Sequence, residues 1–312
     1  MNIILGGTGH VGSATAMSLL QQGEAVTIVT RDPSKGPDWN RRGAEIAVAD
    51  VHDSEALRQV FRQGERLFLL NPSAAPATDT DVEERKTVAA ITAALEGSGL
   101  RKIVAQSTYG AQPGDRCGDL NILYELEQQL RAQPIPASVI RAAYYMSNWD
   151  FALETAEQDG VVNTFFPADF RLPMVAPDDL GRAAARLLKE PIEQTGTHYV
   201  EGPARYTASD VAACLSDELR KDIQVVTAPL EKWQETFESM GFSRAAAESY
   251  ARMTALTLDE LELPANPERG TVSLQRYISN LVAQRRKSAR AGWKPAMTIS
   301  MFSTLYRSKL YY

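Results

Sequence analysis

Short apolar runs alternate with longer stretches of helical hydrophobic spacing over the first 140 residues of the chain. The apolar runs predict strands at Asn2–Leu5, Ala25–Val29, Glu45–Val48, Arg66–Leu70, Lys102–Gln106 and Ala137–Ile140. The stretches between them predict helices near residues 10–22, 54–63, 80–98 and 119–132. Because such alternation builds right-handed β–α–β crossovers, we expect an α/β fold with a parallel sheet covered by helices on both faces.

The alternation fades after about residue 145, where helical patterns predominate. They predict helices over Asp178–Leu188, Ser209–Leu219, Leu230–Met240 and Ser243–Leu261, and one strand over His198–Glu201. We therefore expect three parts along the chain. These are an α/β domain at 1–150, a smaller, mainly helical lobe at 151–282 that is interleaved with the sheet, and a tail at 283–312.

The tail is basic, because the segment from Ala283 to Tyr312 holds seven Lys or Arg and no Asp or Glu. A basic arm suits a nucleic acid, an acidic partner or a membrane surface. Met301, Phe302 and Leu305 dilute its charge, however, which favours a solvated tail or a subunit contact.

Charge and composition exclude several classes of protein. The chain carries 33 Lys and Arg against 39 Asp and Glu, a net charge of −6, which argues against a nucleic-acid binder. No apolar stretch approaches the roughly 20 residues that a membrane helix needs. The scattered histidines give no metal site. The strand-like run at Asn2–Leu5 leaves no room for a signal peptide, so we expect a cytoplasmic protein.

A glycine-rich loop follows the first predicted strand directly. Gly6, Gly9 and Gly12 stand between a buried strand and an amphipathic helix. Glycine permits positive φ and a close approach of the backbone to a pyrophosphate, which the helix N-terminus then binds. The sequence thus predicts a Rossmann-type, doubly wound sheet with a dinucleotide on Gly6, Thr8, Gly9, His10, Val11 and Gly12.

The charges after the second predicted strand favour NADP(H) over NAD(H). Arg31 and Lys35 suit the 2′-phosphate of NADP, where an acidic residue would bind the ribose 2′-hydroxyl of NAD. Asp32 would repel that phosphate if it pointed inward, but the flanking Thr30 and Pro33 favour a turn-capping role for it.

Further cofactor contacts are expected at the ends of the next strands. Asp50 and Val51 could contact adenine, although Asp50 could also cap a turn, and Asp53 is expected to cap the following helix. The pair Asn71-Pro72 and Ser107 also follow strands, at the edge where open α/β sheets bind ligands.

In combination, these residues resemble the NmrA-like branch of the atypical short-chain dehydrogenases over about residues 1–280. The stretches that carry the resemblance are Gly6–Gly12, Thr30–Pro33, Ser107–Ala111, Glu127–Leu130 before Ile140-Arg141, Val175–Ala184, and His198–Gly202 followed by Tyr206-Thr207. The family contains NAD(P)H-dependent reductases of quinones, dyes and related small acceptors. It also contains dinucleotide-sensing regulators that bind the cofactor and catalyse nothing.

The resemblance departs from the ordinary short-chain dehydrogenase at its catalytic pair. Those enzymes use a Tyr that protonates the developing alkoxide and a Lys four residues later that lowers the pKa of the Tyr. The helix predicted at 119–132 lacks this pair, and the position that resembles the family's Lys or His, counted back from Glu127, is Leu123. Hydride transfer to a quinone or cationic dye needs mainly proximity and orientation, however, and solvent can supply the proton.

Two functions therefore stay open. The first, which we favour, is an NADPH-dependent reductase of a small quinone-like or aromatic acceptor. Tyr109 and Tyr124 would be its candidate acids, and Tyr144, Tyr145 and Asn148 would line its pocket. The second is a catalytically silent NADP(H) sensor that binds a regulatory protein partner. We expect neither a nucleic-acid nor a membrane partner, and the sequence leaves the oligomeric state open.

Overall fold

A computed structural model describes residues 1–259 and 263–290 of the chain. Its centre is an eight-stranded sheet in which all the paired strands run parallel. Across the sheet the strands follow the order β13 (Glu268–Arg269), β10 (Gly196–Glu201), β6 (Ala137–Ala142), β5 (Lys102–Thr108), β4 (Arg66–Leu69), β1 (Asn2–Leu5), β2 (Val26–Thr30) and β3 (Glu45–Val48). The order reverses between β1 and β4, which creates the switch point where doubly wound sheets bind dinucleotides.

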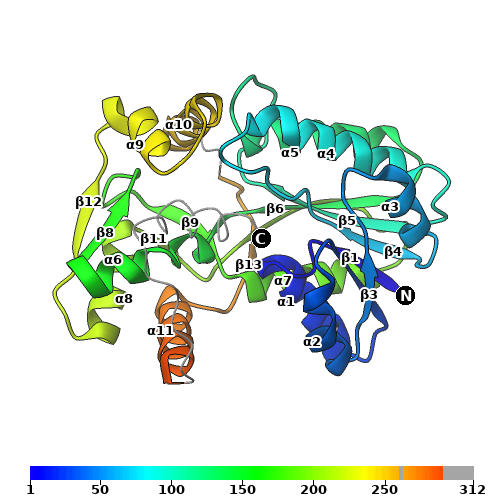
Figure 1. Ribbon diagram of the computed structural model, residues 1–312, viewed down its shortest axis with the longest axis horizontal. Coiled ribbons are helices and arrows are strands. Elements are labelled where there is room, and N and C mark those ends of the chain that lie inside the picture. Colours follow the sequence, from blue (N-terminus) through cyan, green and yellow to red (C-terminus); the bar gives the residue numbers. More distant parts are fainter. Residues whose placement is uncertain (260–262, 291–312) are drawn as a thin grey trace.

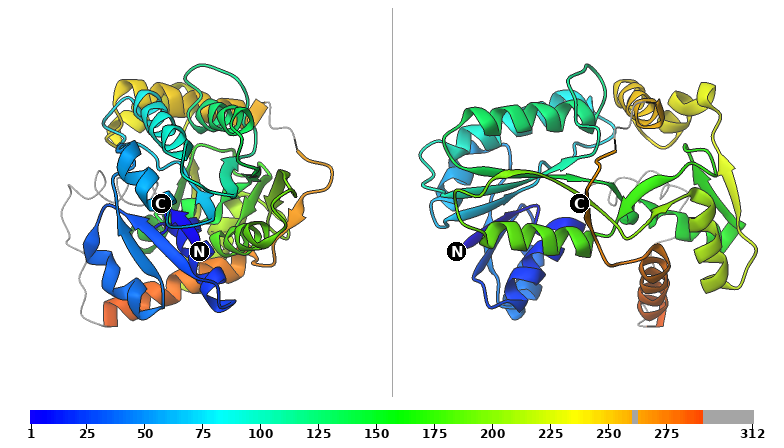
Figure 2. Two further views of the ribbon diagram at one scale, coloured as in Figure 1. Left: turned by 90° about the vertical axis from the view of Figure 1, so that its right-hand side faces the viewer. Right: turned by 180° about the vertical axis from the view of Figure 1, so that it is seen from behind.

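Helices cover both faces of this sheet (Figures 1 and 2). On one face lie α3 (Ser54–Phe61), α4 (Thr80–Leu95) and α5 (Asp119–Ala132); on the other lie α1 (His10–Gln21), α2 (Gly36–Arg41), which follows the 3₁₀ turn η1 (Pro33–Lys35), and α7 (Pro177–Lys189). Strands β1 and β2 are buried along their whole length, because helices pack against both of their sides. The sheet confirms the expected Rossmann-type, doubly wound fold.

Helices α1 and α7 pack together at very short range. A Cβ on Gly181 of α7 would lie 2.4 Å from the main-chain carbonyl carbon of Ala14 in α1. Only glycine therefore permits this approach. As a result a helix from the second half of the chain is fixed against the first helix of the sheet domain.

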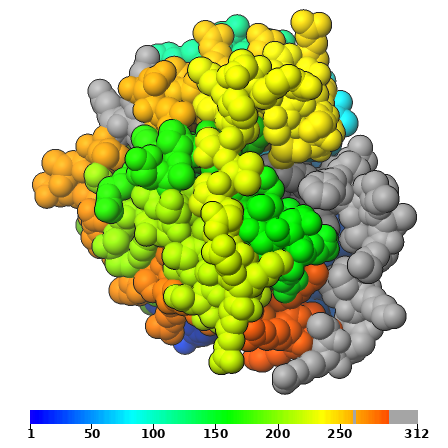
Figure 3. Space-filling model, turned by 90° about the vertical axis from the view of Figure 1, so that its left-hand side faces the viewer, coloured from blue at the N-terminus to red at the C-terminus, as the bar shows by residue number. Residues whose placement is uncertain are grey.

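The remaining elements form a smaller lobe at the carboxyl edge of the sheet (Figure 1). Its helices are η2 (Met146–Trp149), α6 (Ala152–Asp159), α8 (Ala208–Leu219), η3 (Leu230–Lys232), α9 (Trp233–Ser239), α10 (Arg244–Asp259) and α11 (Leu274–Arg290). Its strands form two small sheets, β7 (Tyr144–Tyr145) with β9 (Leu172–Val175) and β11 (Arg205–Tyr206), and β8 (Val161–Thr164) with β12 (Gln224–Thr227). A core of its own, with Met146, Trp149, Val162 and Leu215, holds the lobe together. Figure 3 shows its outward face, with α11 along the lower edge.

The tail predicted at 283–312 begins inside an ordered helix, because α11 runs from Leu274 to Arg290. Two of its basic side chains contact the lobe: Arg285 approaches the Glu157 carboxylate at 3.7 Å, and Arg286 donates to the Glu218 carbonyl oxygen at 2.8 Å. The rest of the predicted tail, including Lys294, Arg307 and Lys309, lies outside the described residues.

None of the helices within the described ranges is long and apolar enough to cross a membrane.

A buried lysine caps the C-terminal end of α7. The Nζ of Lys102, at the start of β5, donates to the carbonyl oxygens of Glu190 at 3.3 Å, Pro191 at 2.9 Å and Gln194 at 3.1 Å. These carbonyls lie just beyond the last turn of the helix, where a positive charge also complements the helix dipole. Burial lowers the pKa of Lys102, so the hydrogen bonds must offset the cost of burying its charge.

We expect Lys102→Met to lower the free energy of unfolding by about 2–3 kcal/mol, because three carbonyls lose a charged donor in a buried position. Urea denaturation followed by circular dichroism measures this change. Lys232→Met is the matched control, since Lys232 is an exposed partner of Glu235 and should change stability by less than about 0.5 kcal/mol. Equal stability of the two variants would show that the carbonyls need no charged cap.

Candidate functional site

The glycine loop between β1 and α1 brings two main-chain segments into direct contact. Gly6 has a φ of +74°, a conformation that residues with a Cβ rarely adopt. The Gly9 N–H donates to the Gly6 carbonyl oxygen at 3.0 Å. A Cβ on Gly12 would lie 2.1 Å from that same oxygen. The first turn of α1 can therefore approach the loop only because residue 12 is a glycine.

The start of α1 has the features of an anion-binding helix N-terminus. Its N-cap residue, Gly9, offers no side chain, and the first turn contains no acidic residue. The first N–H groups of the helix, at His10, Val11 and Gly12, are therefore not capped by a side chain of this turn. Together with the helix dipole they favour a phosphate group at this position.

A cleft of about 670 Å³ opens beside this helix start, at the carboxyl ends of the central strands. Of the residues predicted to contact a cofactor, those that line it are Gly6, Thr8, Arg31, Lys35, Val51 and Pro72. The structure thus brings the glycine loop and the predicted phosphate-binding cations together around one cleft.

Other lining residues were not predicted from the sequence. His52 lines the cleft beside Val51, and Ser73, Ala74, Ala75 and Thr78 line it from the loop after β4. Glu83 and Thr87 of α4 complete this side. The only sequence signal for the loop was its position after a strand that ends at the carboxyl edge.

Asp32, the acidic residue beside Arg31, forms part of a turn. The Asp32 carboxylate accepts a hydrogen bond from the Ser34 N–H at 2.9 Å and caps η1, as the sequence predicted. Hydrogen bonding from Ser34, with a contribution from the charge of Lys35, lowers the pKa of Asp32. Asp32 itself also lines the cleft, together with Arg31 and Lys35 on either side of it.

Asp50 does not reach the cleft. Its Oδ1 accepts a hydrogen bond from the His52 N–H at 2.9 Å, which closes a turn, and the residues on either side of it, Ala49 and Val51, line the cleft instead. Asp53 caps α3 as predicted, because its Oδ1 accepts from the N–H groups of Glu55 and Ala56. Asn71 is buried outside the cleft lining, and its Oδ1 has no hydrogen-bond partner within the described residues.

Ser107 takes part in a buried ionic network rather than facing the cleft. Its hydroxyl donates to the Glu127 Oε1 at 2.6 Å, and its side chain is 2% exposed. Arg141 forms a paired contact with the same carboxylate, at 2.9 Å from Nε to Oε1 and 2.8 Å from Nη2 to Oε2. The predicted contact between this hydroxyl and a cofactor therefore does not fit its placement.

The candidate acid Tyr109 is not among the residues that line the cleft. Its ring packs edge-on against Tyr199 with 5.5 Å between the ring centroids, and its buried hydroxyl has no hydrogen-bond partner within the described residues. Burial, and then the negative charge of Glu201, raise the pKa of Tyr109, so the phenol holds its proton too tightly for a neutral-pH acid. Tyr124 is half-buried on α5 and does not line the cleft.

Of the three residues predicted for the substrate pocket, Tyr144 and Asn148 stay in contact, whereas Tyr145 packs against a different core. Tyr144 packs into the core of the lobe, edge-on to Phe166 at 5.6 Å, and burial raises its pKa to about 12, although a hydrogen bond with Asn148 opposes this. Tyr145 faces the other way and packs against the core of the sheet domain. Burial, and then the charge of Asp119, raise the pKa of Tyr145.

Asp119 has a raised pKa but is not among the residues that line the cleft. It is the first residue of α5 and stands four positions before Leu123, whose side chain packs into the apolar core. Burial, and then the charge of Asp81, raise the pKa of Asp119 to about 6. Its position in the sequence is the one at which the ordinary dehydrogenase helix has its tyrosine.

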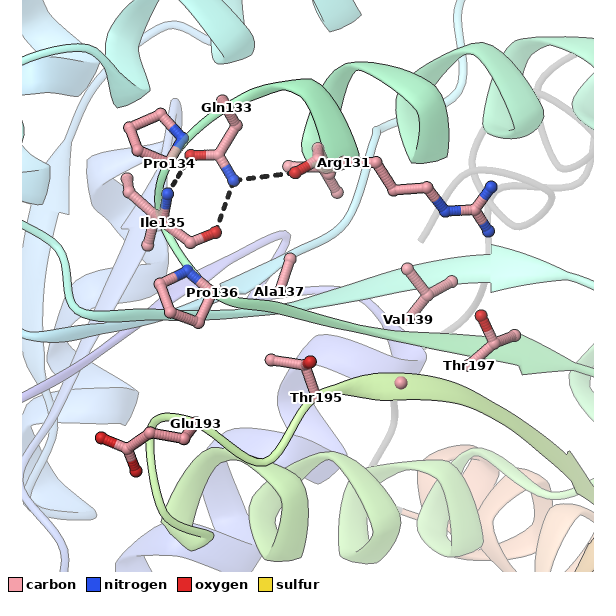
Figure 4. A pocket seen from close by; sticks show the side chains of 12 residues that line it. Arg131, Gln133, Pro134, Ile135, Pro136, Ala137, Val139, Glu193, Thr195 and Thr197 are labelled. Carbon is pink, nitrogen blue, oxygen red and sulfur yellow. Dashed lines mark hydrogen bonds between the residues drawn. The ribbon is translucent and has the colours of Figure 1, made fainter.

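A second hollow, of about 480 Å³, lies at the opposite edge of the sheet, where α5 leads into β6 (Figure 4). Two of its polar side chains already have partners: Gln133 bonds the main chain of Leu130 and Ile135, and Arg131 pairs with Glu127. The carboxyl edge, with its glycine loop and cations, is therefore the better candidate for the functional site.

Within residues 1–259 and 263–290, no three His, Cys, Asp or Glu side chains are arranged to hold a metal ion.

Known proteins match this chain over most of its length. The model of the NmrA-like family matches residues 2–262. NAD(P)H azoreductase of Xenophilus azovorans is 22% identical over 257 residues, which cover 82% of this chain and 87% of that protein. The nitrogen metabolite regulation-like protein bik4 of Gibberella fujikuroi is 25% identical over 281 residues, which cover 80% of this chain and 83% of that protein.

Solved structures share the fold. The triphenylmethane reductase of Citrobacter sp. in complex with NADP(H) superposes with a TM-score of 0.71 at 20% identity, covering 91% of this chain and 99% of that one. The NADPH-dependent quinone oxidoreductase of Escherichia coli in complex with NADPH gives 0.68 at 22% identity, covering 90% and 100%. These likenesses extend over both the sheet domain and the lobe.

The placement of Ser107 yields a test of the ionic network. Ser107→Ala removes a buried hydroxyl donor to a carboxylate, so we expect the free energy of unfolding to fall by about 1–2 kcal/mol. The affinity for NADPH, measured by titration calorimetry, should stay the same, with Thr108→Ala as the neighbouring control. A loss of NADPH affinity at unchanged stability would instead place the Ser107 hydroxyl on the cofactor.

Proposed function

Because the chain belongs to the NmrA-like family, we propose that it is an NADPH-dependent reductase of a small quinone-like or aromatic acceptor. The observation that carries this proposal is the cleft at the switch point of the sheet, bordered by the uncapped start of α1 and lined by Arg31 and Lys35. A helix N-terminus and two cations suit the pyrophosphate and the 2′-phosphate of NADPH.

The residues present fit the cofactor at each part of the cleft. Gly6, Gly9 and Gly12 leave room for the pyrophosphate near the main chain, because none of them carries a side chain. Val51 and His52 offer flat and apolar surface for the adenine ring, and Arg31 and Lys35 offer positive charge for the phosphate on its ribose. When bound, NADPH would supply the hydride, and this chain would bind it, orient it and exclude water.

Named relatives support an aromatic acceptor. The proteins named above include an azoreductase, a triphenylmethane reductase and a quinone oxidoreductase. Azo dyes, triphenylmethane dyes and quinones are all conjugated, electron-poor molecules that accept a hydride equivalent. We infer that this chain reduces the same class of acceptor. We infer also that the acceptor binds at the carboxyl edge of the sheet, next to the lobe.

A silent sensor is the second candidate, and one contact favours it. The loop that lines the cleft after β4 is held at the start of α10 by Ser243. The Ser243 N–H donates to the Pro76 carbonyl oxygen at 2.8 Å, and its hydroxyl donates to the Thr78 carbonyl oxygen at 2.6 Å. A shift of this loop on cofactor binding would therefore reach an outer helix of the lobe. The relative bik4 is named a nitrogen metabolite regulation-like protein, which also supports a regulatory role.

Arg31→Glu tests the choice of cofactor. We expect it to weaken NADPH binding at least about tenfold more than NADH binding, because only NADPH carries the phosphate that the new carboxylate would repel. Titration calorimetry with both nucleotides measures the difference. Arg41→Glu, an exposed arginine that does not line the cleft, should affect the two nucleotides alike. Equal losses in Arg31→Glu would remove this residue from the phosphate site.

Oxidation of NADPH by the purified protein, against a panel of quinones and cationic dyes, tests the reductase itself. We expect turnover above the rate without protein, and loss of both NADPH binding and turnover in Gly9→Asp, because a carboxylate at the start of α1 would repel the pyrophosphate. Tight NADPH binding by the native protein with no turnover on any acceptor would reject the reductase and favour the sensor.

A further inference from the structure

The loop at Pro72–Thr78, between β4 and α4, forms one wall of the proposed cofactor cleft. It contains no helix or strand. It begins beside the glycine loop, because β4 pairs with β1 and the Leu70 side chain lies 3.2 Å from the position of a Cβ on Gly6. A shift of this loop would therefore change the space next to the glycine loop, where we expect the pyrophosphate.

Such a loop needs partners from other elements for its main-chain groups. Helix α10 supplies one set, through the contacts of Ser243 described above. Helix α4 supplies another, because the Glu84 Oε1 accepts a hydrogen bond from the Ala74 N–H at 3.0 Å. Ala74 itself lines the cleft, so this bond joins a wall of the cleft directly to the Glu84 side chain.

Glu84 sits in a fixed and buried position. It is 3% exposed, and one turn further along α4 the residues Val88 and Ile91 pack into the core of the sheet domain. Burial, and then the charge of Asp119, raise the pKa of Glu84 well above its ordinary value, although the bond from Ala74 opposes this. A buried acid is costly, and an apolar residue would suit packing alone, so its hydrogen bond to the loop needs an explanation.

We propose that Glu84 is a positioning residue for the cofactor, because its bond to the Ala74 N–H holds the Pro72–Thr78 loop in the place that the bound cofactor requires. The inference rests on the NADPH binding proposed above. Glu84 does not line the cleft itself, so it acts through the loop. A loop that is held before the cofactor arrives loses less conformational entropy on binding, which raises the affinity.

The position of the loop also predicts which part of the cofactor is affected. In the sheet, β1 separates β4 from β2, and Arg31 follows the end of β2. The loop after β4 therefore lies nearer to the glycine loop than to the proposed site of the 2′-phosphate. Since NADPH and NADH share the pyrophosphate, a displaced loop should weaken both nucleotides alike.

Two variants at position 84 separate the reach of the side chain from its acidity. Glu84→Gln keeps the length and an oxygen that can accept from Ala74, and it removes the acid. Glu84→Asp keeps the acid and is one methylene shorter, so its carboxyl group no longer reaches the Ala74 N–H. Glu127→Asp is the matched control, because it makes the same change at a buried acid that binds Ser107 and Arg141 and does not line the cleft.

Three measurements are made on each protein. Titration calorimetry gives the affinities for NADPH and NADH. Hydrogen exchange without nucleotide, followed by mass spectrometry of overlapping peptides, reports on the Ala74 amide, and the thermal midpoint reports on stability. We expect Glu84→Asp to bind both nucleotides about tenfold more weakly and to exchange the Ala74 amide faster. Glu84→Gln should stay within about threefold of the native affinities and keep the amide protected. Glu127→Asp should lower the thermal midpoint and change neither affinity nor protection.

Native affinities or native protection in Glu84→Asp would reject the positioning role and leave NADPH binding standing. Equal losses in Glu84→Gln and Glu84→Asp would reject it too, because acidity rather than reach would then matter. If Glu84→Asp does not fold, the other proteins decide: a protected Ala74 amide with intact affinity in Glu84→Gln supports the role, and unprotected exchange in the native protein rejects it. Failure of the native protein to bind either nucleotide would reject the proposed cofactor, and the positioning role with it.

Discussion

The structure depends on a main-chain contact that only glycine allows. With 2.1 Å between the Gly6 carbonyl oxygen and the position of a Cβ on Gly12, helix α1 lies directly against the loop that follows β1. Gly181 permits a similar approach of α7 to the other side of α1. The first strand, the first helix and a helix from the second half of the chain are therefore packed tightly together. The cofactor cleft lies beside this contact, since Leu5, Gly6 and Thr8 line it.

The parallel strands of the central sheet were the most predictable part of the molecule. Asn2–Leu5 and Glu45–Val48 form strands with the predicted bounds, because their position in repeating strand–helix units is visible in the sequence alone. Two-residue strands such as Tyr144–Tyr145 carry no periodicity, and helix α2 begins with Gly36 and Pro37, which read as a turn. Such elements are fixed by partners elsewhere in the chain rather than by local preference.

The sequence predicted the edge of the sheet at which the candidate cleft lies, but only some of the side chains that line it. Ser107 ends its strand where a ligand could lie, yet its hydroxyl is bound by Glu127, which follows twenty residues later. Tyr109 is turned toward Tyr199, on a strand that forms much later in the chain. The raised pKa of Asp119 could not be predicted either. Burial, and then the charge of Asp81 in a different helix, raise it, and nothing in the neighbouring sequence distinguishes Asp119 from a helix cap.

The buried carboxyl side chains of Asp81 and Glu84 are hard to explain as a stabilising feature. Buried charges without full pairing cost several kcal/mol, and apolar residues of similar volume are often at least as stable in such positions. Yet the Ser249 hydroxyl, on α10 of the lobe, donates to the Asp81 Oδ1, and the Ala74 N–H, in the wall of the cleft, donates to the Glu84 Oε1. The two carboxyl groups therefore connect the lobe and the loop after β4 to α4, whose residues Glu83 and Thr87 line the cofactor cleft.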